Sequence, residues 1–147
     1  MRSAITEPWS GKHLADVELF SETRAKEAIS ASVVAFGKMR ALSSYARKDI
    51  LRRITRGIES RHEELSNLIA REAGKPIAQA RAEVTRAIST FDIAAEEATR
   101  ITGEVLPLDI TKSSEGFRGE WSRFPRGPVL GISPFNFPLN LVAHKVA

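Results

Sequence analysis

Residues 126–139 read RGPVLGISPFNFPL, and they contain the features that decide the predicted fold. Val129–Ile132 is a short apolar run, which is typical of a β-strand buried on both faces. The loop that follows ends at Pro138, a residue that suits the first turn of a helix. Apolar residues then recur at three and four residues as far as Val146, which predicts one face of that helix. A strand, a loop and a helix in this order predict the opening of an α/β fold.

The segment from Ser21 to about Thr102 predicts three amphipathic helices, because apolar residues recur every three or four positions. Ser21 is placed to cap the first helix, and Leu42–Ser44 predicts a turn with a new N-cap. The second helix is expected to be one continuous apolar stripe of about seven turns. Gly74 would end that helix, and Pro76 suits the first turn of the third.

Short strands are expected on either side of the helices. Leu14–Phe20 is predicted to be a strand that precedes the first helix. Val105–Ile110 is β-prone, although Pro107 places it at a sheet edge. Phe117–Phe124 would be the second arm of a hairpin that turns at Ser113–Gly116. The predicted fold class is therefore α/β, with N-terminal helices, a β-hairpin and a strand–loop–helix unit.

The composition excludes several classes of protein. With 42% hydrophobic and 27% charged residues, the chain is an ordinary globular sequence. No apolar run approaches the roughly 20 residues of a membrane span, so no membrane association is expected. The first thirty residues lack the apolar stretch of a signal peptide, which makes the cytoplasm the expected location. The net charge is +4, but basic and acidic residues alternate through positions 47–100, so nucleic acid is not an expected partner.

Few residues could carry catalysis by themselves. The chain has no cysteine, which excludes a thiolate nucleophile or ligand among these residues. His13, His62 and His144 have no second ligand at a suitable spacing, so no metal site is expected. The paired carboxylates Glu63-Glu64 and Glu96-Glu97 are expected to lie on solvated helix faces.

Asn136 is the exception, because it lies between two aromatic residues and two prolines in Pro134–Pro138. The prolines restrict the backbone on either side and so fix the direction of the amide. An amide NH₂ at the carboxyl end of a strand can donate a hydrogen bond to a developing oxyanion. The same pattern also fits a tight turn with a helix cap, and spacing alone leaves both interpretations open.

The segment 126–139 resembles the signature segment of the aldehyde dehydrogenase superfamily. Residues 51–76 and 82–97 resemble the N-terminal helices of that family, in the same order. The resemblance therefore covers nearly the whole chain after residue 20. Phe135 stands where the family pattern usually has tryptophan, which is a conservative change.

This resemblance implies a particular chemistry. In that family a cysteine thiolate attacks the aldehyde, a glutamate acts as general base, and hydride passes to NAD or NADP. Asn136 would donate to the oxyanion of the thiohemiacetal. The backbone of four neighbouring residues would border the ribose and nicotinamide of the cofactor, namely Ile132, Ser133, Pro134 and Phe135. The cysteine, the glutamate and the glycine-bearing cofactor turn are not among these 147 residues.

The resemblance also implies three parts. Residues 1–106 would be the N-terminal helical part of the cofactor-binding domain, and residues 107–125 an oligomerisation hairpin. Residues 126–147 would be the first strand, the Asn loop and the helix start of a Rossmann-like domain. Because the last predicted helix reaches Ala147 without a cap, we expect the first third of an aldehyde-oxidising enzyme that forms a homodimer or homotetramer. The alternative is a short, inactive interaction module that pairs through its hairpin.

Overall fold

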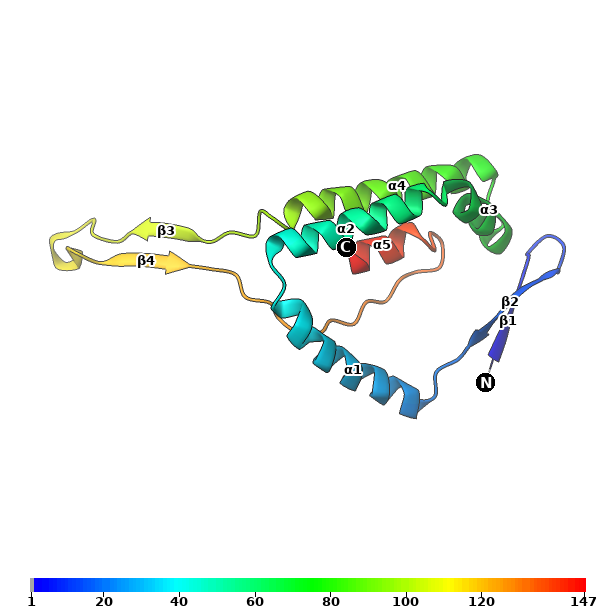
Figure 1. Ribbon diagram of the computed structural model, residues 1–147, viewed down its shortest axis with the longest axis horizontal. Helices are drawn as coiled ribbons and strands as arrows, with labels where there is room; N and C mark the ends of the chain where they lie inside the picture. Colours follow the sequence, from blue (N-terminus) through cyan, green and yellow to red (C-terminus); the bar gives the residue numbers. More distant parts are fainter. Residues whose placement is uncertain (1) are drawn as a thin grey trace.

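The computed structural model describes residues 2–147, and helix α4 (Ile77–Glu97) is its central element. Helices α2 (Ser44–Glu59), α3 (His62–Ala73) and α5 (Asn140–Val146) all pack against α4 (Figure 1). The apolar face of α4 therefore supplies most of the core. The buried core residues are Ile69, Ala80, Val84, Ala87, Phe91, Ala95, Ala98 and Ala143.

The second predicted helix is in fact two helices, so the prediction of one continuous stripe is wrong. Helix α2 ends at Glu59 and α3 begins at His62. Arg61 leaves the helical conformation, with φ −113° and ψ 20°. The apolar periodicity continues across this break because both helices pack against α4. Periodicity reports which residues face the core, and it is therefore insensitive to a change of helix direction.

The predicted helix ends are confirmed. Ser21 accepts a hydrogen bond from the backbone of Arg24 at 3.2 Å, and Ser43 accepts one from Ala46 at 3.1 Å. Gly74 ends α3 in the left-handed conformation, with φ 65°. Pro76 occupies the N-cap of α4, directly before the first turn where it was expected. These ends depend on contacts within a few residues, which explains why they follow from the sequence.

The N-terminal region lies apart from the α2–α5 body (Figure 1). Strand β1 (Arg2–Thr6) pairs antiparallel with β2 (His13–Glu18), which overlaps the predicted strand at 14–20. Helix α1 (Glu22–Arg40) has no buried residue. An ion pair between Arg71 of α3 and Glu7, 2.6 Å apart, links the β1–β2 turn to the body.

The predicted hairpin is present and projects far from the helices (Figure 1). Strand β3 (Glu104–Pro107) pairs antiparallel with β4 (Arg118–Trp121). The short 3₁₀ helix η1 (Lys112–Ser114) forms part of the turn. The apolar side chains along this arm are exposed, namely Val105, Leu106, Leu108, Ile110, Phe117, Trp121 and Phe124.

Val129–Ile132 does not form the predicted buried strand. The segment is extended, and its side chains are exposed by 79% at Val129, 85% at Leu130 and 77% at Ile132. Both sheets within residues 2–147 are two-stranded hairpins, and neither includes this segment. A strand needs a neighbour to satisfy its backbone hydrogen bonds, and this segment has none among the described residues. The fold is mixed α/β, as predicted, but the first strand of a layered sheet is absent from it.

Candidate functional site

The loop that carries Asn136 lies between the extended segment at 122–132 and helix α5. Residues 135–139 form a series of turns that rest against the end of α3 and the first half of α4. A pocket of about 400 Å³ opens at this place. It is lined by Glu72, Ala73, Lys75, Phe135, Asn136 and Pro138. The loop thus places Asn136 in the lining of this pocket.

The side chain of Asn136 is free to act as a donor. It is exposed, and its amide makes no hydrogen bond within residues 2–147. The N-cap position of α5 is Leu139, which makes no side-chain capping bond. Asn136 is therefore not the cap of this helix, although it does lie in a turn, as the alternative interpretation of the Asn/Pro pattern predicts. An unpaired amide in the lining of a pocket can donate two hydrogen bonds to a bound oxygen.

A buried carboxylate holds the backbone just after Asn136. The side chain of Glu83, on α4, is fully buried. Its Oε1 accepts hydrogen bonds from the backbone amides of Leu139, at 3.0 Å, and Asn140, at 3.2 Å. These amides begin helix α5 and have no partner within the helix, so a carboxylate is well suited to this position.

Lys75 completes this arrangement from the short connection between α3 and α4. Its Nζ lies 2.6 Å from Oε2 of Glu83 and 3.9 Å from the centre of the Phe137 ring. The guanidinium of Arg86 also lies over that ring, at 4.8 Å. Cations over an aromatic face are attracted by its quadrupole. The residues on both sides of Pro138 are thereby attached to charged groups of the helical body.

The four residues expected to border a cofactor differ in their availability. Phe135 is 92% exposed, and Ile132 and Pro134 are exposed as well. Ser133 is half-buried, and its hydroxyl donates to the backbone carbonyl of Leu141 at 3.3 Å. Three of these residues therefore offer side-chain surface, whereas Ser133 offers mainly its backbone.

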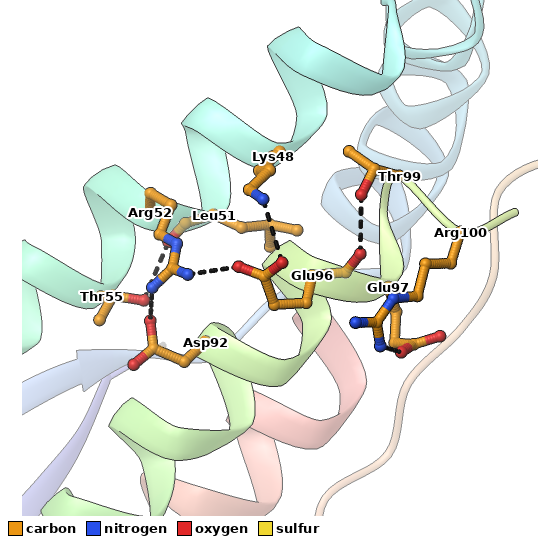
Figure 2. Close-up of polar contacts among 9 residues, drawn as sticks. All are labelled: Lys48, Leu51, Arg52, Thr55, Asp92, Glu96, Glu97, Thr99 and Arg100. Atoms are coloured by element: carbon orange, nitrogen blue, oxygen red, sulfur yellow. Dashed lines mark hydrogen bonds and ion pairs between the residues drawn. The ribbon is translucent and has the colours of Figure 1, made fainter.

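A second polar cluster joins α2 to α4 (Figure 2). Glu96 pairs with Lys48, at 3.1 Å, and with Arg52, which also binds Asp92 at 2.7 Å. Hydrogen bonds from Lys48 and Arg52 lower the pKa of Glu96 below its ordinary value. The hydrogen bond with Glu96 likewise raises the pKa of Arg52. This cluster ties the two helices together and has no contact with Asn136.

The other paired carboxylates also form ion pairs, so the expectation of merely solvated faces was incomplete. Glu97 binds Arg100, and Glu64 of α3 binds Arg61, the residue just before that helix. Glu63 binds Arg81 of α4 at 2.9 Å. Within residues 2–147, no group of three acidic or histidine side chains lies close enough to hold a metal ion. None of the helices described is long and apolar enough to cross a membrane.

Sequence reasoning missed Glu83 and Lys75. A signal for Glu83 was present, because it lies three residues after Ala80 and four before Ala87, on the apolar face of α4. A charged residue in such a stripe is seldom buried without a partner. The partner could not be read from the sequence, since Leu139 lies 56 residues away.

The helices, the hairpins and the Asn136 loop can be compared with known protein families. The model of the aldehyde dehydrogenase family matches residues 2–147. The chain therefore belongs to the aldehyde dehydrogenase family, and the resemblance seen in residues 51–139 is confirmed.

Individual relatives cover the chain almost completely. Lactaldehyde dehydrogenase from Methanocaldococcus jannaschii is 39% identical over 147 residues, which is 97% of this chain and 30% of that protein. Aldehyde dehydrogenase 21 from Physcomitrella patens, solved with the reaction product succinate, superposes with a TM-score of 0.95 at 43% identity. That match covers 99% of this chain and 30% of the other chain.

A third relative is the NADP-dependent glyceraldehyde-3-phosphate dehydrogenase from Bacillus halodurans, solved with NADP. It superposes with a TM-score of 0.93 at 34% identity, over all of this chain and 31% of its own. The chain thus spans 30% to 31% of the length of these relatives. Its fold matches part of a larger enzyme fold.

Proposed function

We propose that this chain is the N-terminal part of an NAD(P)⁺-dependent aldehyde dehydrogenase, and that Asn136 donates a hydrogen bond to the oxyanion formed during catalysis. The observation that carries the proposal is the free, exposed amide of Asn136 in the lining of a pocket. The membership of the chain in the family supports it. The complete protein would oxidise a small aldehyde to an acid.

Asn136 would act by electrostatic stabilisation. As a nucleophile adds to the aldehyde carbon, negative charge develops on the carbonyl oxygen, and a donor already in place stabilises that charge. The loop holds the Asn136 backbone between Pro134 and Pro138, and the attached residues Phe137 and Leu139 follow it, so little reorganisation is needed. The nucleophile is not in this chain, which has no cysteine. The family's cysteine would come from another part of the complete protein.

NAD or NADP would supply the hydride acceptor. We propose that Ile132, Pro134 and Phe135, with the backbone of Ser133, border its ribose and nicotinamide. Their exposure fits this role, because a flat ring can pack against uncovered apolar side chains. The solved relatives from Bacillus halodurans and Methanocaldococcus jannaschii, both glyceraldehyde-3-phosphate dehydrogenases, are complexes with NADP. They support this class of cofactor.

The division into 1–106, 107–125 and 126–147 is part of the same proposal. The arm made by β3 and β4 would pair subunits of a dimer or tetramer, and its exposed apolar side chains support that role. A cytoplasmic location remains a prediction of the sequence. The family match over residues 2–147 does not favour the alternative of an inactive interaction module.

The decisive experiment replaces Asn136 in the full-length protein. Loss of one oxyanion donor costs about 10²–10³ in turnover, so Asn136→Ala should lower kcat by that factor while the affinity for NAD(P)⁺ is retained. Asn136→Asp should be at least as harmful, because a carboxylate repels the oxyanion. Asn67→Ala is the control, since Asn67 is exposed on α3 and its amide binds only the carbonyl of Glu63. An Asn136→Ala enzyme with more than half of the normal activity would refute the proposal.

A further inference from the structure

We infer that Glu83 and Lys75 form a positioning pair that holds the Asn136 loop in its active orientation. The inference rests on the proposed function of Asn136 and names two residues that act through it. Neither residue is required to touch substrate. Their role would be to restrain the backbone on the C-terminal side of Asn136.

The first support is that both oxygens of the Glu83 carboxylate accept hydrogen bonds. One oxygen accepts both amides at the start of α5, and the other binds Lys75 at 2.6 Å. A buried charge is strongly unfavourable unless it is paired and hydrogen-bonded. Glu83 has no exposed surface at all, among neighbours such as Ala80, Val84 and Ala87. An apolar residue would serve the packing of α4 equally well, so the carboxylate is better explained by what it holds.

The second support is the path from this pair to Asn136. Lys75 contacts the ring of Phe137, the residue directly after Asn136, and lines the same pocket as Asn136. Glu83 fixes the backbone at Leu139, three residues after Asn136. Pro138 stiffens the short link between these two points. The pair therefore holds two of the three residues that follow the catalytic amide.

The third support is that the rest of the loop has few other attachments. Phe135, Asn136 and Pro134 are exposed, and the extended segment before them is exposed as well. On the N-terminal side of Asn136, the hydroxyl of Ser133 donates one hydrogen bond to the carbonyl of Leu141. Loss of the Glu83 contacts would consequently free the loop at Leu139 and Asn140, where it has the most contacts with the helical body.

Such a release should act on turnover rather than on binding. A displacement of about 1 Å in a catalytic group can cost about 10²-fold in rate. The nicotinamide and the aldehyde would keep their other contacts, so their binding should change little. We therefore expect kcat to fall while the KM values for aldehyde and cofactor stay within about threefold, as for an interaction made mainly in the transition state.

The test uses Glu83→Gln, Glu83→Ala and Lys75→Met in the full-length enzyme. Glu83→Ala removes the acceptor for both amides, and kcat should fall about 10- to 100-fold, as for other residues that orient a catalytic group. Glu83→Gln retains one carbonyl oxygen as an acceptor, so its kcat should fall less than that of Glu83→Ala. Hydrogen exchange at the amides of Leu139 and Asn140 should speed up in the same order as kcat falls, which gives a readout independent of activity.

The matched control is Glu96→Gln. Glu96 lies on the same helix, about 20 Å along it from Glu83, and it also forms a close ion pair between helices. Its loss should lower thermal stability but leave kcat and the exchange of Leu139 and Asn140 unchanged. If Glu83→Ala does not fold, Glu83→Gln and Lys75→Met decide the question, because each retains part of the buried network.

Coupling between the two residues gives a second readout. If they act as one unit, Lys75→Met combined with Glu83→Gln should lower kcat by much less than the product of the two single effects. The double variant also removes the uncompensated buried charge that Lys75→Met leaves. Strictly multiplicative effects would overturn the inference.

Two outcomes separate this inference from the proposed function. If Asn136→Ala inactivates the enzyme while Glu83→Gln and Lys75→Met behave like Glu96→Gln, the positioning pair is wrong and the function of Asn136 stands. If Asn136→Ala retains its activity, both are overturned, whatever the exchange of Leu139 and Asn140.

Discussion

Helix α4 and helix α1 are similar in length and yet very different in environment. Helix α4 buries six of its residues against α2, α3 and α5, whereas α1 buries none. Both carry apolar residues at helical spacing, and on α1 Ile29, Val33 and Val34 remain exposed. The difference shows that an apolar face predicts a helix but becomes part of a core only where a second face meets it.

The same contrast extends to the two ends of the Asn136 loop. On the C-terminal side, α5 packs on α4 and its first amides bind Glu83. On the N-terminal side, Val129–Ile132 is extended and exposed. One half of the proposed site is thus built by the helical body, and the other half is uncovered apolar chain.

The largest expected effect is on the core of the body. Phe91 is 5% exposed and packs with Ala87 and Ala143, so Phe91→Ala should lower the free energy of unfolding by about 3–5 kcal/mol. Phe124 is 83% exposed on the extended segment, and Phe124→Ala should change it by less than about 0.5 kcal/mol. Chemical denaturation of both variants measures the difference. Equal losses of unfolding free energy in the two variants would contradict the difference between the helical body and the exposed segment.

The uncovered segment should make the isolated 147-residue chain bind a hydrophobic dye. Exposed, unpaired extended chain recruits other apolar groups. Leu130→Ser and Ile132→Ser should reduce both dye fluorescence and light scattering, because each side chain is more than three-quarters exposed. Ile69→Ser, in the core, should increase them by loosening the body. A chain that binds no dye and melts in one sharp transition would contradict the exposure of this segment.

Acid should weaken the joint between α2 and α4. The folded pKa of Glu96 lies below its ordinary value because Lys48 and Arg52 donate hydrogen bonds to the carboxylate. Its contribution is therefore present above the unfolded pKa of about 4.3 and is lost as the pH falls through the folded pKa. Glu96→Gln should show a smaller loss of thermal stability over this range than the wild-type chain. Glu97→Gln is the control, because the ion pair of Glu97 with Arg100 is local to the C-terminal end of α4 and does not join α4 to α2. If Glu96→Gln loses as much thermal stability in acid as the wild-type chain, the loss is due to other carboxylates.

The smallest expected effect compares two glycines inside helices. Apart from adjacent residues and the nearby backbone of its own helix, a Cβ at Gly57 of α2 or at Gly37 of α1 would meet no atom within 4 Å. Alanine should favour each helix by up to about 1 kcal/mol. Gly57→Ala should raise the unfolding midpoint of the body, whereas Gly37→Ala should raise helical circular dichroism alone, because α1 has no buried residue. A higher midpoint in Gly37→Ala would show that α1 is coupled to the body.

Much of the molecule follows from the sequence by itself. The caps at Ser21 and Ser43, the left-handed Gly74 and the hairpin of residues 104–121 were all predictable. Each depends on contacts between residues that are close in the chain, or on a simple antiparallel return. The position of Asn136 between two prolines was visible too, and so was the family to which the chain belongs.

Tertiary structure alone decided the remaining features. The break at Arg61 depends on how two helices lie on α4, and the exposure of Val129–Ile132 depends on whether a neighbouring strand is present. The attachment of the Asn136 loop to Glu83 joins groups 56 and 57 residues apart. A sequence pattern reports the preference of each residue for burial and for a local conformation. Which distant partner satisfies a buried charge is settled only when the packed elements bring the two groups together.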